Sequence, residues 1–279
     1  MNFFFVYFII NIIYKMNKIS KELLDYFNGD ELASDTWLKK YKLGVEGNPN
    51  EERTPDDMHQ RLSKEFAKVE YNFKKDDKNI NKLSEYGKKL EVEYSDLSLS
   101  GLEKRYYNLF KNFKYVIPQG SIMAQAGNPS IGSLSNCLIL GEPSDSYGGI
   151  CLKDQELVQA IKRRCGVGLD ISKLRPSEAP TSNAAKTSTG AVTFMNRYSN
   201  TTREAAQNGR RGALMISMDV NHPDILDFIK SKRDITKITG ANISIKLNDE
   251  FMKAVESDSD YILRFPCDSS VGHIDEYED

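Results

Sequence analysis

Cysteine and histidine are scarce in this chain, which has four cysteines and three histidines among 279 residues. The cysteines are widely spaced, and no CxxC pair or Cys/His cluster with zinc-ligand spacing is present. We therefore expect no metal site. Scattered cysteines in a chain of this size are typical of the reducing cytosol, where thiols stay free unless they act in catalysis. A cytoplasmic protein is expected.

An excess of basic residues is also missing, because 38 Lys and Arg residues are balanced by 40 Asp and Glu residues. The resulting net charge is -2. Binding to a nucleic-acid backbone requires a concentrated basic surface. The composition therefore argues against a nucleic-acid partner.

Long hydrophobic runs are absent except at the start, where residues 1–14 read MNFFFVYFIINIIY. This run is shorter than the roughly 20 residues that span a bilayer. It has no basic segment before it and no small-residue cleavage site after it, so it is a poor signal peptide. A membrane anchor is the alternative, but we favour an upstream extension, residues 1–15, ahead of a natural start at Met16. No membrane partner is expected.

Helical patterns dominate residues 16–112. A helix is predicted to begin at Thr54, because Pro55 suits the first helical position and the acids at 56 and 57 favour the positive helix end. One apolar stripe at helical spacing follows. It consists of Met58, Leu62, Phe66, Val69 and Phe73.

From residue 113 onward, short apolar runs alternate with helical patterns, which predicts βαβ units and a largely parallel sheet. The predicted strands are 137–140, 167–171, 213–218, 243–247 and 261–265. The predicted helices are 154–164, 191–206, 223–232 and 249–256. The segments His222-Pro223-Asp224 and Asn248-Asp249-Glu250 are typical helix starts. The expected fold class is therefore α/β, preceded by a helical region.

Generic nucleotide-binding and catalytic motifs are missing: there is no P-loop, no GxGxxG and no HExxH. Two glycine-rich segments, 166–168 and 209–212, are each explained by a tight turn. Their chemistry allows more, since glycine lets backbone amides approach a phosphate and arginine matches phosphate oxygens. The loop at 207–212 could therefore bind a base and a phosphate together.

The order of longer segments resembles the catalytic subunit of ribonucleotide reductases. The segments are PQGSIMAQAG (118–127), SLSNCLIL (133–140), SDSYGGI (144–150), KRRCGVGLDISKLRP (162–176), NAAKTSTGAVTFMNRYSN (183–200), REAAQNGRRGALM (203–215), NHPDILDFI (221–229) and TGANISIKLNDEFM (239–252). So many long segments in one order are highly specific, although no single one would be. The resemblance implies an N-terminal helical region over 16–112, the N-terminal half of a reductase-type α/β barrel over 113–268, and an acidic tail over 269–279.

The resemblance also assigns active-site roles. Cys137 matches the first cysteine of the pair that is oxidised to a disulfide as the ribose is reduced; without the resemblance it would be a small buried hydrophobe. Ser121 and Asn136 match substrate-binding positions, and Gly166 matches a glycine whose backbone lies against the substrate. The match at Ser121 is weakened because Ile122 stands where the family usually has proline. The other three cysteines, Cys151, Cys165 and Cys267, match no redox position and are expected to be structural.

A second set of residues matches the family's effector site, where a deoxynucleotide or ATP binds at the interface of a homodimer. Taken alone, Asp145 would be a turn acid and Arg175 one half of a surface ion pair. The matched effector-site residues are Asp145, Ser146 and Arg175. The loop that connects effector to substrate base is matched by Gln207, Asn208, Gly209, Arg210, Arg211 and Gly212.

The chemistry implied by the resemblance is thiyl-radical reduction of a nucleoside diphosphate to a deoxyribonucleotide for DNA synthesis. The radical would come from adenosylcobalamin or from a metal-containing small partner subunit. A thioredoxin-like dithiol would reduce the cysteine pair again. The residues that separate the two radical sources are not identified in this sequence.

The sequence departs from the family in lacking the Asn-x-Cys-x-Glu finger loop, a second member of the Cys137 pair and the shuttle cysteines. We expect these in a C-terminal half of the subunit, and we expect the chain alone to have no reductase activity. The alternative function is an inactive or split-gene nucleotide-binding fragment that needs a separate C-terminal half. A half barrel would also expose apolar sheet edges and favour self-association.

Overall fold

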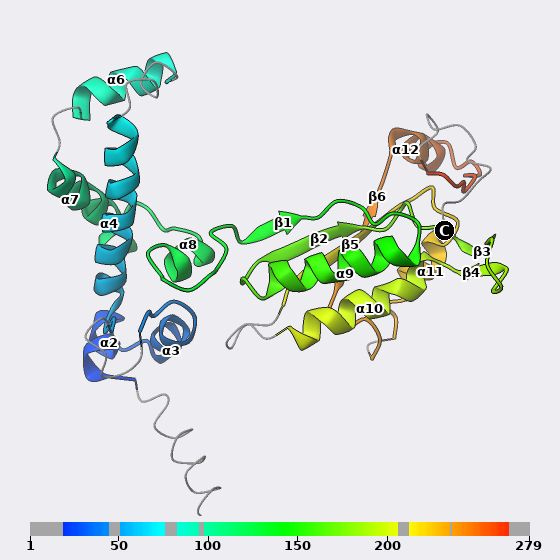
Figure 1. Ribbon diagram of the computed structural model, residues 1–279, viewed down its shortest axis with the longest axis horizontal. Coiled ribbons are helices and arrows are strands. Elements are labelled where there is room, and N and C mark those ends of the chain that lie inside the picture. Colours follow the sequence, from blue (N-terminus) through cyan, green and yellow to red (C-terminus); the bar gives the residue numbers. More distant parts are fainter. Residues whose placement is uncertain are drawn as a thin grey trace, which may run out of the picture. The chain divides into compact units, whose positions relative to one another are not determined.

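The computed structural model describes residues 19–44, 51–75, 83–94, 98–205, 212–234 and 236–267. The chain divides into two compact units, Met1–Leu134 and Ser135–Asp279, each with a hydrophobic core of its own (Figure 1). The apolar run at residues 1–14 lies outside the described residues. None of the helices in the described ranges is both long and apolar enough to cross a membrane.

The first unit is built from helices. They are α2 (Lys21–Tyr26), α3 (Glu31–Lys40), α4 (Pro55–Lys74), α6 (Glu85–Tyr94), α7 (Leu99–Phe110), the 3-10 turn η1 (Lys111–Phe113) and α8 (Gly120–Gln125). The predicted start of α4 is confirmed, since Pro55 is its first residue and the Asp57 carboxylate accepts a hydrogen bond from the Thr54 amide. Ser20 and Asp30 cap α2 and α3 through their side-chain oxygens, which accept from backbone amides of the first turn.

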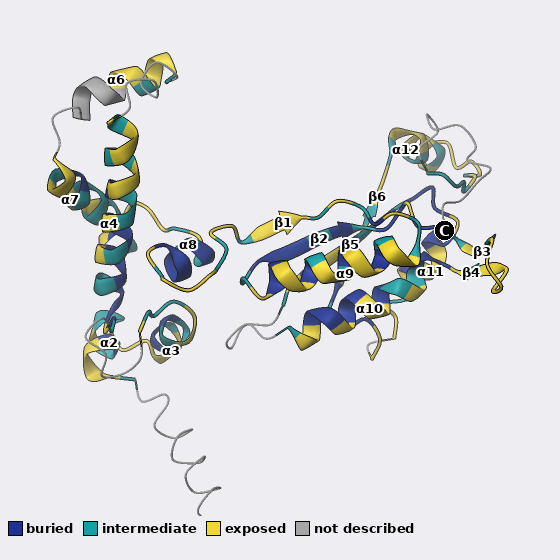
Figure 2. Ribbon diagram, viewed as in Figure 1, coloured by how far each residue is buried: buried dark blue, intermediate teal, exposed yellow. Residues whose placement is uncertain are grey.

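The core of this unit gathers around the first half of α4. Met58 and Leu62 are fully buried, and α4 packs against α7. The predicted stripe is wrong in its second half, because Val69 and Phe73 are 69% and 41% exposed. Figure 2 shows that α4 is mostly buried in its first half and mostly exposed in its second half. The hydrophobic core covers only the first half of α4. The apolar residues in the second half keep the helical spacing but are not buried by other parts of the unit. Helix α8, which the sequence analysis placed in the second region, contributes Met123 to the core of the first unit.

The second unit alternates strands and helices. Its elements are β1 (Cys137–Ile139), α9 (Tyr147–Ile161), β2 (Gly166–Asp170), β3 (Ser177–Pro180), β4 (Thr187–Thr189), α10 (Ala191–Glu204), β5 (Leu214–Asp219), α11 (Ile225–Lys230), β6 (Asn242–Lys246) and α12 (Asp249–Glu256). Four parallel strands form a sheet in the order β1-β2-β5-β6, and β3 and β4 form an antiparallel hairpin. The predicted fold class, helices followed by a parallel α/β arrangement, is confirmed. The sheet formed by the described strands does not close into a barrel.

Four of the five predicted strands are confirmed. The fifth, at 261–265, is wrong: this segment joins no sheet, and it is held instead by the Arg264 amide, which donates to the carbonyl of Asn221 at 2.7 Å. Helix α9 begins seven residues earlier than the predicted 154, because Ser146 caps it by accepting from the Gly149 amide at 3.0 Å. The β3–β4 hairpin was not predicted.

The sheet has two different faces. Helices α9, α10 and α11 contribute to one hydrophobic core with alternate strand residues such as Val167, Ile216 and Met218. Strand residues between these point to the other side, because successive side chains alternate across a strand. That side, called the open face below, carries Cys137, Ile139, Gly166, Gly168, Asp170, Met215, Ser217, Asp219, Asn242, Ser244 and Lys246. Its residues are mostly half-buried or exposed.

Candidate functional site

The cysteine singled out by the sequence lies at the amino end of β1, and its side chain is exposed. β1 runs parallel to β2 with Cys137 beside Gly166. The Gly166 amide donates to the carbonyl of Asn136 at 2.7 Å. Three predicted site residues, Asn136, Cys137 and Gly166, therefore meet at one edge of the sheet, with the thiol on the open face.

Gly166 keeps the space beside this thiol free. A Cβ atom at position 166 would lie 3.5 Å from Sγ of Cys137 and 3.3 Å from the carbonyl oxygen of Asn136. The second contact is tighter than ordinary van der Waals packing. A glycine at this position therefore leaves room for another molecule to approach the thiol and the backbone.

The structure describes only one residue of the predicted loop at 207–212, which was matched to the connection between effector and substrate base. Gln207, Asn208, Gly209, Arg210 and Arg211 lie outside the described residues. Gly212 is described, and a Cβ atom there would lie 2.6 Å from the carbonyl oxygen of Thr202 and 3.3 Å from Ile161. Gly212 therefore packs closely on α10 and α9 just before β5 begins, at the same edge of the parallel sheet as Cys137.

Ser121 belongs to the first unit. It lies in α8 and is buried, with 2% of its surface exposed. Its predicted role as a substrate ligand stays a prediction, because Cys137 belongs to the second unit.

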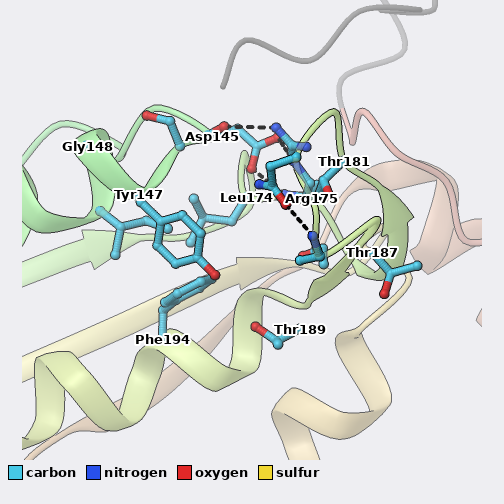
Figure 3. A pocket seen from close by; sticks show the side chains of 14 residues that line it. Asp145, Tyr147, Gly148, Leu174, Arg175, Thr181, Thr187, Thr189 and Phe194 are labelled. Atoms are coloured by element: carbon cyan, nitrogen blue, oxygen red, sulfur yellow. Dashed lines mark hydrogen bonds and ion pairs between the residues drawn. The ribbon is translucent and has the colours of Figure 1, made fainter.

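A pocket of about 210 Å³ lies at the opposite edge of the sheet (Figure 3). The start of α9, the segment after β2, the β3–β4 hairpin and the first turn of α10 form its walls. Its lining includes all three predicted effector residues, Asp145, Ser146 and Arg175. The remaining lining residues are Tyr147, Gly148, Ile150, Leu174, Thr181, Asn183, Ala185, Thr187, Ser188, Thr189 and Phe194.

Asp145 and Arg175 are joined by three contacts inside this pocket. The Arg175 Nε donates to Oδ2 of Asp145 at 2.8 Å, and the Arg175 amide donates to Oδ1 at 2.9 Å. A second guanidinium nitrogen donates to the backbone carbonyl of Asp145 at 3.1 Å. Arg175 is 7% exposed, so this is a largely buried pair and not the surface ion pair considered above. The pair fixes the segment after β2 to the turn that starts α9.

Two aromatic rings line another part of the pocket. Tyr147 and Phe194 meet edge to face with ring centroids 5.9 Å apart, on the side away from the Asp145–Arg175 pair (Figure 3). The sequence analysis singled out neither residue. Tyr147 is the first residue of α9, which starts earlier than the sequence predicted. Phe194 lies on α10, whose contact with α9 was not predicted either.

The two candidate sites lie at opposite ends of the same strands. At about 3.3 Å per residue, the five residues of β2 separate the two edges of the sheet by roughly 15 Å. Helix α10 also runs between the two edges, from Phe194 in the pocket to Thr202, which contacts Gly212 just before β5. The two sites are therefore linked by continuous secondary structure.

The remaining cysteines differ in their surroundings. Cys165 is buried and its thiol donates to the carbonyl of Gly166 at 3.2 Å. Burial, with a smaller contribution from Asp219, raises the pKa of Cys267 to about 12. Cys151 is exposed on α9. Within the described ranges, no group of three or more His, Cys, Asp or Glu residues is arranged to hold a metal ion.

Comparison with known proteins decides the family. The family described as ribonucleotide reductase, barrel domain, matches residues 135–278, just over half of the chain. The chain belongs to this family. The match begins at the first residue of the second unit, so the sheet, the cysteine edge and the pocket all lie within the reductase barrel domain.

Individual relatives carry names that agree with this assignment. A vitamin B12-dependent ribonucleotide reductase of Streptomyces clavuligerus is 29% identical over 251 residues, which are 81% of this chain and 24% of that protein. A vitamin B12-dependent ribonucleoside-diphosphate reductase of Thermoplasma acidophilum is 35% identical over 52% of this chain and 19% of its own length. The ribonucleoside-diphosphate reductase NrdEB subunit alpha of Bacillus subtilis is 28% identical over 53% of this chain and 14% of its own length. The chain thus spans a quarter or less of these relatives.

Proposed function

We propose that this chain supplies the amino-terminal part of the catalytic subunit of a ribonucleotide reductase, which reduces nucleoside diphosphates to deoxyribonucleotides. The observation that carries the proposal is the exposed thiol of Cys137 beside Gly166 on the open face of a reductase barrel sheet. In the proposed reaction a C2′–O bond of the ribose is replaced by a C2′–H bond and the oxygen leaves as water. Two thiols supply the two electrons and become a disulfide. Cys137 is one of the two thiols, and the other belongs to the remaining, C-terminal part of the subunit.

Adenosylcobalamin, or a metal-containing small subunit, would supply the radical that starts this reaction. The vitamin B12-dependent relatives favour adenosylcobalamin, while the name subunit alpha of the Bacillus subtilis relative implies that a different subunit works with it. None of the described residues is assigned to holding either group. In this reaction Cys137 gives up its thiol hydrogen, and Asn136 and Gly166 present the backbone that a ribose would lie against.

The pocket at the other edge is proposed to bind a deoxynucleotide or ATP effector, and a homodimer is proposed to complete it. The amino end of α9 favours an anion because of the helix dipole. The hydroxyl-rich hairpin offers donors and acceptors for a sugar, and the exposed ring of Tyr147 offers a surface on which a base can stack.

Turnover in the presence and absence of the remaining, C-terminal part of the subunit tests the catalytic part of the proposal. We expect deoxynucleotide formation from a nucleoside diphosphate, a thioredoxin-like dithiol and the radical source only when both parts are present. Cys137→Ser should abolish it, whereas Cys151→Ser, a matched change at another exposed cysteine, should not. Turnover by the Cys137→Ser protein would refute the assignment. Nucleotide binding without turnover under any combination would favour the alternative, a nucleotide-binding fragment.

Direct binding tests the effector pocket. Tyr147→Ala should weaken the binding of fluorescent mant-dATP to the chain by about fivefold or more, because base–aromatic stacking contributes roughly 1–3 kcal/mol. Tyr115→Ala is the matched control, since Tyr115 is as exposed as Tyr147, at 68% against 67%, and lies in the first unit. Equal affinities of the unaltered chain, the Tyr147→Ala protein and the Tyr115→Ala protein for mant-dATP would contradict the proposed pocket.

A further inference from the structure

The turn after β5 places two buried polar side chains behind the pocket. His222 is fully buried and Asp224 is 8% exposed, and neither lines the pocket. Both were predicted to start a helix. Helix α11 does begin here, at Ile225, and Asp224 is the residue before it, but the side chain of Asp224 makes no cap. The two side chains instead bind backbone groups from segments that do form the pocket walls.

Asp224 holds both ends of the β3–β4 hairpin. Its carboxylate accepts from the amide of Ser177, at 3.0 and 3.2 Å to the two oxygens, and from the amide of Ala191 at 3.0 Å. Ser177 opens β3, and Ala191 opens α10 just after β4. A single buried carboxylate thus clamps the hairpin at its base and joins it to the first turn of α10.

His222 holds the segment that carries Arg175. Its Nδ1 accepts from the Asp224 amide at 3.0 Å, so Nε2 is the protonated nitrogen and donates to the carbonyl of Leu174 at 2.8 Å. Leu174 lines the pocket and precedes Arg175, which binds Asp145. The connection therefore continues from the turn through Arg175 to the start of α9.

Gly190 completes this arrangement. Its φ of +84° lies in the left-handed region, and a Cβ atom there would lie 2.7 Å from Oδ2 of Asp224 and 2.9 Å from the Ser177 amide nitrogen. Any side chain at this position would therefore push the carboxylate and the hairpin apart.

We propose that His222 and Asp224 are positioning residues for the effector pocket. They do not contact the nucleotide, but they set the affinity of the pocket for it by fixing the positions of the hairpin, the Arg175 segment and α10 relative to one another. This inference rests on the proposed function of the pocket. It assigns the turn between β5 and α11 to effector binding, although the turn lies outside the pocket.

The test compares Asp224→Asn with Asp227→Asn in the full chain. The carboxamide introduced by Asp224→Asn would have only one oxygen to accept from two backbone amides, so we expect the dissociation constant for mant-dATP to rise at least tenfold. Asp227 lies on α11 with a side chain that is 74% exposed, so its conversion to Asn should change affinity less than twofold. Both proteins are measured well below their melting temperatures, which are determined in parallel.

Hydrogen exchange supplies a readout that general destabilisation would not reproduce. Without nucleotide, Asp224→Asn should speed exchange in residues 177–191 while the amides of β2 and β5 keep their protection. Gly190→Ala should show the same exchange pattern and the same loss of affinity with Asp224 intact, and it serves as the main variant if Asp224→Asn does not fold.

Three outcomes separate the possible failures. Unchanged affinity in both Asp224→Asn and Gly190→Ala would overturn the positioning role. Equal weakening in Asp227→Asn would also overturn it, because the effect would not depend on the buried contacts. If the unaltered chain binds no nucleotide while the variants still show faster hairpin exchange, the proposed effector function fails, and the role of the clamp in nucleotide binding fails with it.

Discussion

At the scale of single residues, His59 is the most exceptional side chain of the first unit. It is fully buried on α4, and neither ring nitrogen has a hydrogen-bond partner among the described residues. Its ring meets that of Phe113 edge to face, with centroids 4.6 Å apart. Burial lowers the pKa of His59 to about 4, although the nearby Asp56 carboxylate partly opposes this. The imidazole of the folded chain is therefore neutral at pH 7.

This burial predicts that the first unit loses stability as the pH falls. Because the pKa is lower in the folded state than in the unfolded state, the contribution of His59 is complete above about pH 6.5 and declines towards pH 4, by up to roughly 3 kcal/mol. Trp37, the single tryptophan, is buried in the same core, so its fluorescence during urea unfolding reports this unit. His59→Leu should flatten the dependence of unfolding free energy on pH between 6.5 and 4. An identical slope in both proteins would show that His59 is not the responsible group.

At the scale of elements, Arg61 ties α4 to α8 and to the segment before α4. Its Nε donates to Glu52 at 2.6 Å, and a second nitrogen donates to the carbonyl of Met123 at 2.8 Å. Glu52 also accepts from the amide of Leu43 at 2.7 Å. The Arg61 and Glu52 side chains are only 11% and 6% exposed, so each charge depends on the other.

Removing one partner of this pair should destabilise the first unit strongly. We expect Arg61→Met to lower the free energy of unfolding by about 3–5 kcal/mol, because the Glu52 carboxylate is left buried and unpaired. Arg105→Met is the control, since the side chain of Arg105 is 32% exposed and its guanidinium lies 3.8 Å from Glu70, a pair expected to contribute about 1 kcal/mol or less. Urea unfolding followed by Trp37 fluorescence measures both. A loss below about 1 kcal/mol for Arg61→Met would contradict the expectation.

Elements were predictable from the sequence where their signals are local. Four strands and the helices at 191–204 and 249–256 follow from apolar periodicity and caps; for example, Asn248 accepts from the Phe251 amide at 2.8 Å. The β3–β4 hairpin was missed because it is polar and short, and because Asp224, a residue 47 positions from Ser177, holds its base. The sequence predicted the pocket lining only in part. The family resemblance pointed to Asp145 and Arg175, but nothing in the sequence indicated Tyr147 or Phe194.

At the scale of the whole molecule, the outer strand of the sheet in the second unit carries exposed apolar residues. β1 is an outer strand, and its Ile139 is 90% exposed. Parallel sheets are normally covered on both faces and paired at their edges or protected by charge. The uncovered edge of β1 is therefore expected to pair with further protein, and in the isolated chain to favour self-association.

A charge on this edge should reduce that association. We expect Ile139→Lys to lower the average mass measured by multi-angle light scattering towards that of one chain, because a lysine on an edge strand opposes pairing between strands. Ile131→Lys is the matched control: Ile131 is 84% exposed but lies in the first unit and outside any strand. A monodisperse, unassociated parent chain, or equal effects of the two substitutions, would contradict the role of the edge.

The sequence by itself determined the fold class, four of the strands in the parallel sheet and the position of Cys137 at the start of a strand, because these depend on neighbouring residues and on ordered motifs. Only the tertiary structure decided that Cys137 and Gly166 share the open face, and that Asp145 and Arg175, 30 positions apart, form one wall of a pocket. It also showed that the carboxylate of Asp224, the residue before α11, binds both ends of the hairpin and does not cap the helix. The physical reason is that a buried polar group must find a partner wherever the fold offers one, and that partner can be distant in the sequence.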